Sequence, residues 1–415
     1  MISTERPVLT GNNSWFTILG LFLILLYPLA GGPVSAAERA QDAPAGEEYT
    51  GEVANPPHGL AMHGQPELPA DFDNFSYVNP DAPQGGRIAY GFNGSFDSLN
   101  QFIVRGVAPR GLMDGVLGSN VYEGLMFRNR DEAFTMYGLI ADTIKTDPER
   151  TFLEVTIHPD AKFSDGEPIK VDDILFTIDL FREKGRPPYS RWMQAIESVE
   201  RIGERGVRMN LGDGKNRELP LLLGIIPILP KHAIDFDTFD QSNLTPILGS
   251  GPYVISDVNP GTRVVLKKNP DYWARDLPVR AGFDNFDEII IDYYREESSR
   301  FEAFRKGLFD TNPEGNPARW SGDYDFPAVR NGQIVLDTYQ TATPSGMQAI
   351  IFNTRQDKFA DKRVREAFTY LFDFEWVNTN LFAGAYERTA SLFHNSELSS
   401  YQRPVDEAEK ALLGT

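Results

Sequence analysis

The clearest pattern of apolar and polar positions lies in the second quarter of the chain. Residues 151–157 alternate between the two kinds of side chain, as a half-buried strand does, and residues 163–168 form an Asp-Gly turn. Residues 171–181 then carry apolar side chains at helical spacing, and Gly185 supplies a stop signal. The pattern predicts a strand, a turn and an amphipathic helix, which is typical of an α/β protein.

The same periodicities predict further elements along the chain. The predicted strands are residues 86–92, 287–294 and 348–353, with a hairpin over 198–211 that turns at 203–206. The predicted helices are residues 115–127, 298–307 and 363–374. Residues 58–86 are rich in proline and show little periodicity. We therefore expect irregular backbone there, packed by the aromatic side chains of Phe72, Phe75 and Tyr77.

Candidate chemistry is sparse. His58 and His63 have neither a carboxylate nor a third histidine at a fixed spacing, so no metal site is predicted. We interpret His232 as a surface residue at the start of a helix rather than as a catalytic base. The one Gly-Ser-Gly, at residues 249–251, lacks the spacing of a nucleophile elbow. Carboxylates are too abundant for any one pair to stand out as that of a glycosidase. We expect a protein that binds and does not catalyse.

Length and charge narrow the class of protein. A chain of 415 residues predicts two or three domains, and 41% hydrophobic residues are enough to fill their cores. The formal net charge of −19 argues against nucleic acid as a partner, because its phosphates would be repelled. The sequence also contains no Gly-rich phosphate loop of the Walker type.

The first 36 residues predict an export signal. Residues 15–30 are almost wholly apolar, and Val34-Ser35-Ala36 gives the small-residue cleavage pattern. The alternative is a membrane anchor, which needs about 20 apolar residues where this stretch has about 16. The sequence has no cysteine, which excludes disulfides, thiolate metal sites and a lipid-modified cysteine. We expect cleavage after Ala36 and an exported protein in a Gram-negative periplasm, not anchored by lipid.

Several strings resemble a known family. FSDGEPIKVDD, at residues 163–173, resembles the signature of extracellular solute-binding family 5, the peptide and nickel receptors of ATP-driven importers. Lys170 stands where that family usually has a hydroxyl residue that would cap the helix. Three more strings are similar to the amino-terminal signature of the YejA-like periplasmic peptide-binding proteins of this family. They are HGLAMHG at 58–64, YVNPDAPQGG at 77–86 and FDSLNQFIVRG at 96–106. Further matches are LPKH at 229–232, LGSGPYVI at 248–255, VVLKKNPDYW at 264–273 and residues 363–374.

The resemblance implies a fold and a set of boundaries. It implies an α/β, two-lobed periplasmic binding protein of type II, of the class with an extra subdomain, with an incomplete lobe II. The expected parts are a signal peptide (1–36), a flexible lead (37–46), lobe I (47–102 and 214–313), an inserted subdomain (103–213) and a partial lobe II (314–415). Residues 312–332 are the candidate crossover between the lobes.

The resemblance also implies a function. The protein would be the periplasmic receptor of an ABC importer, closing about a hinge on an oligopeptide or a peptide-like compound. Its partners would be the peptide ligand and an inner-membrane permease with its ATPase subunits; it would need no cofactor, and the intact family is monomeric. Two alternatives stay open, a receptor for another solute, such as a nickel chelate, haem or a sugar, and a secreted hydrolase.

The site residues come from positions within the motifs. The resemblance implies strand-edge ligand contacts at Arg105, Gly106, Val107 and Ala108, and at Ser250, Gly251 and Tyr253. Tyr122, Tyr339 and Met347 are added because of their expected place beside the cleft. On this interpretation, Gly251→Val weakens ligand binding and leaves a cooperative melt.

The family's lobe II continues beyond the point that matches the DEAEKALLGT end of this sequence. The resemblance places the carboxylate that binds the peptide amine in that later part. We therefore expect the 415-residue chain, expressed alone, to aggregate or to show a disordered end, and to bind peptide more weakly than an intact relative.

Overall fold

The computed structural model describes residues 51–114, 118–132, 134–339, 346–396 and 398–414. The predicted signal peptide and flexible lead lie outside these residues. In the described part of the chain, no helix is both long and apolar enough to span a membrane.

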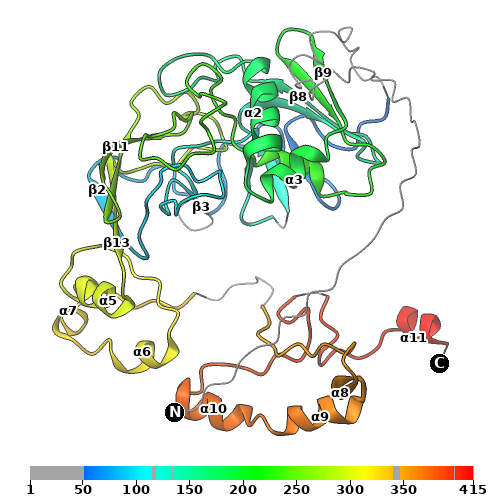
Figure 1. Cartoon of the computed structure of the whole chain (residues 1–415), viewed down its shortest axis with the longest axis vertical. Coiled ribbons are helices and arrows are strands. Elements are labelled where there is room, and N and C mark those ends of the chain that lie inside the picture. Colours follow the sequence, from blue (N-terminus) through cyan, green and yellow to red (C-terminus); the bar gives the residue numbers. More distant parts are fainter. Residues whose placement is uncertain (1–50, 115–117, 133, 340–345, 397, 415) are drawn as a thin grey trace, which may run out of the picture.

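A four-stranded sheet contains two of the predicted strands (Figure 1). Its order is β11 (Tyr253–Asn259), β12 (Arg263–Lys268), β13 (Glu288–Tyr294) and β2 (Arg87–Asn93). The first three strands run antiparallel, and β2 joins β13 in parallel. Side chains of β13 alternate between two cores, because Ile289 and Ile291 enter the largest buried cluster while Ile290 packs on the second. The predictions for residues 86–92 and 287–294 are confirmed.

A second four-stranded sheet carries the strand, turn and helix predicted from residues 151–185. Its order is β7 (Ala141–Lys145), β8 (Phe152–Ile157), β10 (Gly206–Asn210) and β9 (Ser198–Ile202). The helices α2 (Val171–Lys184) and α3 (Tyr189–Gln194) accompany it (Figure 1). Leu153, Val155 and Ile157 on β8 share the largest cluster with Ile174 and Ile178 on α2. The predicted hairpin over 198–211 is also confirmed.

Helix α2 begins without the hydroxyl cap that Lys170 replaces. Instead, the carboxylate of Asp173 accepts a hydrogen bond from the Lys170 backbone N–H at 2.8 Å. Its other oxygen accepts from the backbone N–H of Lys231 at 2.9 Å. Asp173 therefore supplies half of a capping box and also ties the helix to the LPKH string. The helix ends at the predicted stop, where the Gly185 N–H donates to Phe181.

A three-stranded sheet includes part of the segment that was predicted to be a helix, residues 115–127. It comprises β1 (Gly59–Ala61), β6 (Thr135–Gly138) and β5 (Met126–Arg128), and β3 (Met113–Asp114) pairs with β4 (Gly118–Ser119). The helix predicted for residues 115–127 is wrong over its described part, 118–127. Backbone groups of residues 120–125 bond to distant segments, as when the Gly251 N–H donates to Val121. Apolar spacing near that of a helix also fits an extended segment that is buried on all sides.

The irregular segment over residues 58–86 packs as predicted around its aromatic side chains. Phe75 is fully buried and stacks on Phe72 and on Tyr77, with each pair of ring centroids 5.5 Å apart. Phe75 belongs to a third cluster with Tyr137 and Tyr272, and Phe72 packs against it. The short helix α4 (Leu219–Gly224) places Leu219, Leu221 and Leu223 in the largest cluster.

The second buried cluster moves the proposed boundary between the lobes. Helices α5 (Glu297–Arg305), α6 (Pro317–Gly322) and α7 (Pro327–Arg330) follow β13. Tyr324 and Phe326 pack in one cluster with Phe301 and with Ala89 of β2. Residues up to Ile334 therefore pack with strand β2 and helix α5. This packing favours a start of lobe II beyond residue 334 rather than at 314, and the boundary stays a prediction. The largest cluster likewise runs across the borders proposed at 103 and 213, so lobe I and the inserted subdomain share one core.

The described residues of 346–396 and 398–414 contain four short helices: α8 (Asp357–Ala360), α9 (Lys362–Tyr370), α10 (Phe374–Leu381) and α11 (Glu407–Leu413). The helix predicted for 363–374 is confirmed but ends at Tyr370. The strand predicted for 348–353 is wrong, because no described segment pairs with it. Ile350 and Ile351 in that stretch are 83% and 90% exposed.

Limited proteolysis tests this proposed boundary. We expect the first cuts within residues 346–356, which are mostly exposed and whose stretch 346–352 makes no backbone hydrogen bond within the described chain, and later cuts within 324–334, where Tyr324 and Phe326 are buried. Mass spectrometry of the early fragments locates the cuts. Early cleavage within 324–334, with 346–356 resistant, would contradict this boundary.

Candidate functional site

The strongest surface candidate among the predicted residues is the loop that ends the FDSLNQFIVRG string. Asp97 closes the loop, because its carboxylate accepts from the Val107 N–H at 2.6 Å and its own N–H donates to the Val107 carbonyl at 3.0 Å. A second segment supports it, since the Leu99 N–H donates to the Asn243 carbonyl at 2.8 Å. The loop is thus held at its base, and we call residues 104–107 the tip loop.

The tip loop presents both apolar side chains and backbone groups. The side chains of Val104 and Val107 are 73% and 58% exposed. Within the described chain, neither Arg105 nor Gly106 uses its backbone N–H or C=O in a hydrogen bond. Gly106 has a φ of +81°, and a Cβ there would lie 2.6 Å from Ser242 Oγ, so the turn requires glycine. Ala108, at the end of the predicted stretch, is half-buried.

The other predicted stretch, the glycines and serine of LGSGPYVI, lies inside the protein. The Gly251 N–H donates to the Val121 carbonyl and the Tyr253 N–H to the Asn120 carbonyl, both at 2.9 Å. A Cβ on Gly251 would lie 2.6 Å from the Asn120 carbonyl oxygen. The missing side chain at Gly251 therefore allows the backbone of residues 120–121 of the same chain to approach closely.

The two buried tyrosines of the prediction make internal contacts. The Tyr122 hydroxyl donates to the Ile247 carbonyl at 3.3 Å, and the Tyr253 hydroxyl donates to the Phe286 carbonyl at 2.8 Å. Burial raises the pKa of both hydroxyls above the usual value. Ser250 is also buried, at 1% exposure. The structure brings Tyr122, Ser250, Gly251 and Tyr253 together, and their contact with a ligand stays a prediction.

Tyr339 and Met347 are surface residues on either side of residues 340–345. Tyr339 is 80% exposed, and its hydroxyl donates to Asp337 at 3.3 Å. Met347 is 46% exposed. In the described part of the chain, neither side chain joins a buried cluster with the other predicted residues. Their place beside a cleft stays a prediction.

Three of the family-like strings, at residues 163–173, 229–232 and 248–255, contact one another through the hydrogen bonds of Ser164 and Asp165. The N–H and the hydroxyl of Ser164 both donate to the Gly249 carbonyl at 2.9 Å. The carboxylate of Asp165 lies 2.7 Å from Nε2 of His232. Burial raises the pKa of Asp165, but hydrogen bonds from His232 and from the Glu167 N–H together lower it below its usual value. His232 lies at the surface as predicted, although it occupies a turn and starts no helix.

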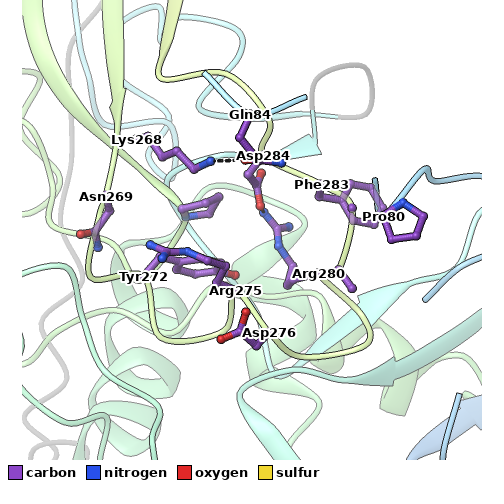
Figure 2. A pocket seen from close by; sticks show the side chains of 13 residues that line it. Pro80, Gln84, Lys268, Asn269, Tyr272, Arg275, Asp276, Arg280, Phe283 and Asp284 are labelled. Carbon is purple, nitrogen blue, oxygen red and sulfur yellow. Dashed lines mark hydrogen bonds and ion pairs between the residues drawn. The ribbon is translucent and has the colours of Figure 1, made fainter. Parts of the chain in front are cut away.

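A surface pocket that the sequence did not predict lies over the VVLKKNPDYW string. It encloses about 540 Å³. Figure 2 shows charged side chains around it: Lys268, Arg275, Asp276, Arg280 and Asp284. None of the ten predicted ligand residues lines it. The sequence signal is the three basic residues within 268–280, of which only Lys268 belongs to a string that resembles the family.

The comparisons with known proteins agree with the resemblance found in the sequence. The family model described as "Bacterial extracellular solute-binding proteins, family 5 Middle" matches residues 135–413. A binding protein of Brucella melitensis, whose name states no ligand, is 52% identical over 362 residues, covering 86% of this chain and 59% of the relative. Peptidoglycan-binding protein YepA of Agrobacterium fabrum is 48% identical over 372 residues, covering 87% and 60%. The probable peptide-binding protein YejA of the same organism is 33% identical over 356 residues, covering 84% and 57%. The chain spans about three fifths of the length of these relatives.

Solved structures show the same fold at low identity. NikA from Brucella suis, solved with Fe(III)-EDTA, has a TM-score of 0.59 at 19% identity, covering 79% of this chain and 63% of that one. AppA from Bacillus subtilis, solved with a nonapeptide, has a TM-score of 0.54 at 19% identity, covering 80% and 64%. The predicted family and fold class are thus confirmed. This chain belongs to the bacterial extracellular solute-binding proteins of family 5 and has the α/β, type II periplasmic-binding-protein fold.

Proposed function

We propose that this protein is the substrate-binding component of an ABC importer and that it binds peptides or peptide-like fragments of peptidoglycan. Membership of a family of solute receptors supports a binding role. The names of two Agrobacterium relatives support the ligand class, since one is a peptidoglycan-binding and the other a peptide-binding protein. On this proposal the protein is exported to the periplasm and delivers its ligand to an inner-membrane permease with ATPase subunits.

The tip loop is the observation that carries the ligand class. Peptides offer amide groups at regular intervals, and exposed backbone N–H and C=O groups can pair with them whatever the peptide sequence. Arg105 and Gly106 leave such groups unpaired, and Val104 and Val107 place apolar side chains beside them. This combination suits a ligand that has both a peptide backbone and apolar side chains.

Calorimetry tests the proposal directly. Titrations would use linear oligopeptides, muropeptides released from peptidoglycan, a nickel–histidine chelate, haem and an oligosaccharide. Saturable binding of either peptide class supports the proposal, and the tighter class names the ligand. Binding of only the chelate, haem or the sugar would overturn it in favour of another solute. Turnover of the peptides or the sugar would indicate a hydrolase.

Val107→Ser tests the tip loop. The Val107 side chain is 58% exposed, and its backbone bonds to Asp97 do not depend on the side chain, so we expect unchanged stability. We expect roughly fivefold weaker peptide binding, because apolar surface worth about 1 kcal/mol would no longer be buried by the ligand. Leu308→Ser is the matched control, because Leu308 is 56% exposed and follows α5, outside every predicted contact. Equal affinity of the two variants would remove the tip loop from the site.

A further inference from the structure

A single carboxyl group lies where two of the family-like strings meet residues 120–125 inside the protein. Glu123 follows Tyr122 in residues 120–125 and has no exposed surface. Its Oε1 accepts a short hydrogen bond from the hydroxyl of Tyr272, which comes from VVLKKNPDYW. Ser250, from LGSGPYVI, lies close enough for its hydroxyl to influence the carboxyl. Three segments far apart in the sequence therefore meet at this side chain.

Two oxygens at this junction have no partner in the described structure, and neither does the nearby Nε of Arg280. The oxygens are Glu123 Oε2 and Ser250 Oγ; both are buried, and neither makes a hydrogen bond of normal geometry. A buried carboxylate oxygen without a donor is costly, because it has left water and gained nothing in exchange. A hydrogen bond between the two oxygens would remove both deficits, either from the serine hydroxyl to a carboxylate or from a protonated carboxyl to the serine oxygen, so the surrounding charges decide between the two forms.

The charges around Glu123 favour the neutral acid. The titratable groups that face it are Tyr272, Arg280 and Asp284, and residues 227–228 contribute only backbone, through the bond from the Ile228 N–H to the Glu123 carbonyl. Arg280 is already paired with Asp284 at 2.6 Å, with side-chain exposures of 3% and 14%. An ionised Glu123 would leave the buried group with one excess negative charge. Burial raises the pKa of Glu123 to about 7, although Arg280 and the hydroxyls of Tyr272 and Ser250 lower it, and the negative charge of Asp284 raises it further.

We propose that Glu123 is a buried proton-binding site: its carboxyl is held as a neutral acid whose Oε2–H donates to Ser250 and whose Oε1 accepts from Tyr272. Loss of this proton leaves an uncompensated charge where the three segments meet, so the contact between them is weaker in alkaline than in acidic solution. The proposal goes beyond ligand binding and does not depend on the identity of the ligand.

The direction of the pH dependence follows from the two pKa values. An unfolded glutamate titrates near 4.5, and folded Glu123 near 7. Between these values the folded chain holds a proton that the unfolded chain releases, so stability falls as pH rises through this window. Below the window both states are protonated and above it both are ionised, so this group adds no further slope.

Thermal unfolding of wild type and Glu123→Gln at pH values from 4.5 to 8.5 tests the proposal. Glutamine reproduces the neutral acid, since its amide can donate to Ser250 and its oxygen can accept from Tyr272. We expect the variant to melt about 5 °C above wild type at pH 8 and to match it near pH 4.5. Parallel pH profiles of the two proteins would overturn the proposal.

Glu132→Gln is the matched control. Glu132 is also a buried glutamate that binds a tyrosine hydroxyl, that of Tyr137, but its oxygens accept from Asn129 and from the Glu67 N–H as well. A glutamine there turns a donor toward other donors, so we expect a lower melting temperature at pH 8. A gain at pH 8 in both variants would show that the effect does not belong to Glu123.

Difference infrared spectroscopy gives a readout that does not depend on how the variant folds. Wild type at pH 6 should show the carbonyl band of a protonated carboxyl that disappears by pH 8.5, and Ser250→Ala should shift that band by removing its acceptor. If wild type shows no such band at pH 6, Glu123 is not the proposed neutral acid.

Discussion

A single methyl group at position 249 should remove much of the stability of the first lobe. Gly249 has an ordinary φ, so its backbone would accept alanine, but the added Cβ would lie 1.9 Å from the Val121 carbonyl oxygen. Neither partner can easily move. The Val121 carbonyl accepts from Gly251, and the Gly249 carbonyl accepts two hydrogen bonds from Ser164. We expect Gly249→Ala to cost on the order of 3–5 kcal/mol of unfolding free energy.

Urea unfolding followed by circular dichroism measures this loss. Gly315→Ala is the matched control, because a Cβ there meets nothing within 4 Å and its φ is also ordinary. We expect the control to stay within about 0.5 kcal/mol of wild type. If the two alanine variants are equally stable, the contact between residues 249 and 121 is looser than the structure shows.

The same contact changes what can be learned from Gly251→Val. The sequence predicted weaker ligand binding with an intact melt, but a Cβ at 251 also meets backbone, at 2.6 Å from the Asn120 carbonyl oxygen. We now expect this variant to be destabilised, so its affinity would report folding as much as ligand contact. The tip loop is the better place to test binding, because Val104 and Val107 are mostly exposed.

The spacing of apolar side chains was enough to predict the helices and strands whose buried and exposed faces alternate regularly. The strand at 287–294 alternates because its two faces meet two different cores, and Ile289 and Ile290 show this directly. The strand, turn and helix around residues 151–185 are specified by side chains within a few positions of one another. In such elements, the spacing of apolar residues in the sequence shows directly which side chains are buried.

The wrong predictions share a physical cause: the structure of these segments depends on hydrogen bonds and contacts with residues far away in the sequence. Residues 118–127 were predicted to be helical, yet their backbone bonds go to residues around 139, 228 and 251. Residues 348–353 have strand composition, but a strand also needs a paired neighbour, and the described chain supplies none. Tyr122 and Tyr253 pack among core side chains, and their predicted contact with a ligand stays a prediction.

The buried polar groups were beyond sequence reasoning for the same reason. Glu123 and its hydrogen-bond partner Tyr272 are 149 residues apart. The one available signal was a lone glutamate within the apolar run VYEGLM, at residues 121–126, which is unusual for a residue that is seldom fully buried. That Glu123 lies where three segments meet can be seen only once the fold is known.

Arg280 should be the most costly charge to remove from this protein. Its guanidinium lies against the rings of Phe127, Tyr272 and Phe283, with centroid distances of 5.2, 5.6 and 5.6 Å. It also pairs with Asp284 at 2.6 Å, where its own side chain is 3% exposed. Arg280→Met would keep much of the apolar contact but would leave Asp284 without its cation, so we expect a loss of about 3–5 kcal/mol.

An exposed ion pair of the same length provides the control. Arg363 and Asp361 also approach to 2.6 Å, but the arginine side chain is 89% exposed, so Arg363→Met should produce no measurable change. The double variant Arg280→Met/Asp284→Asn should recover part of the loss, because the remaining partner no longer carries an unpaired charge. Urea unfolding at pH 7 compares all four proteins. Equal stability of Arg280→Met and Arg363→Met would show that burial does not set the strength of the Arg280 pair. A double variant less stable than Arg280→Met would show that the unpaired carboxylate of Asp284 is not the source of the loss.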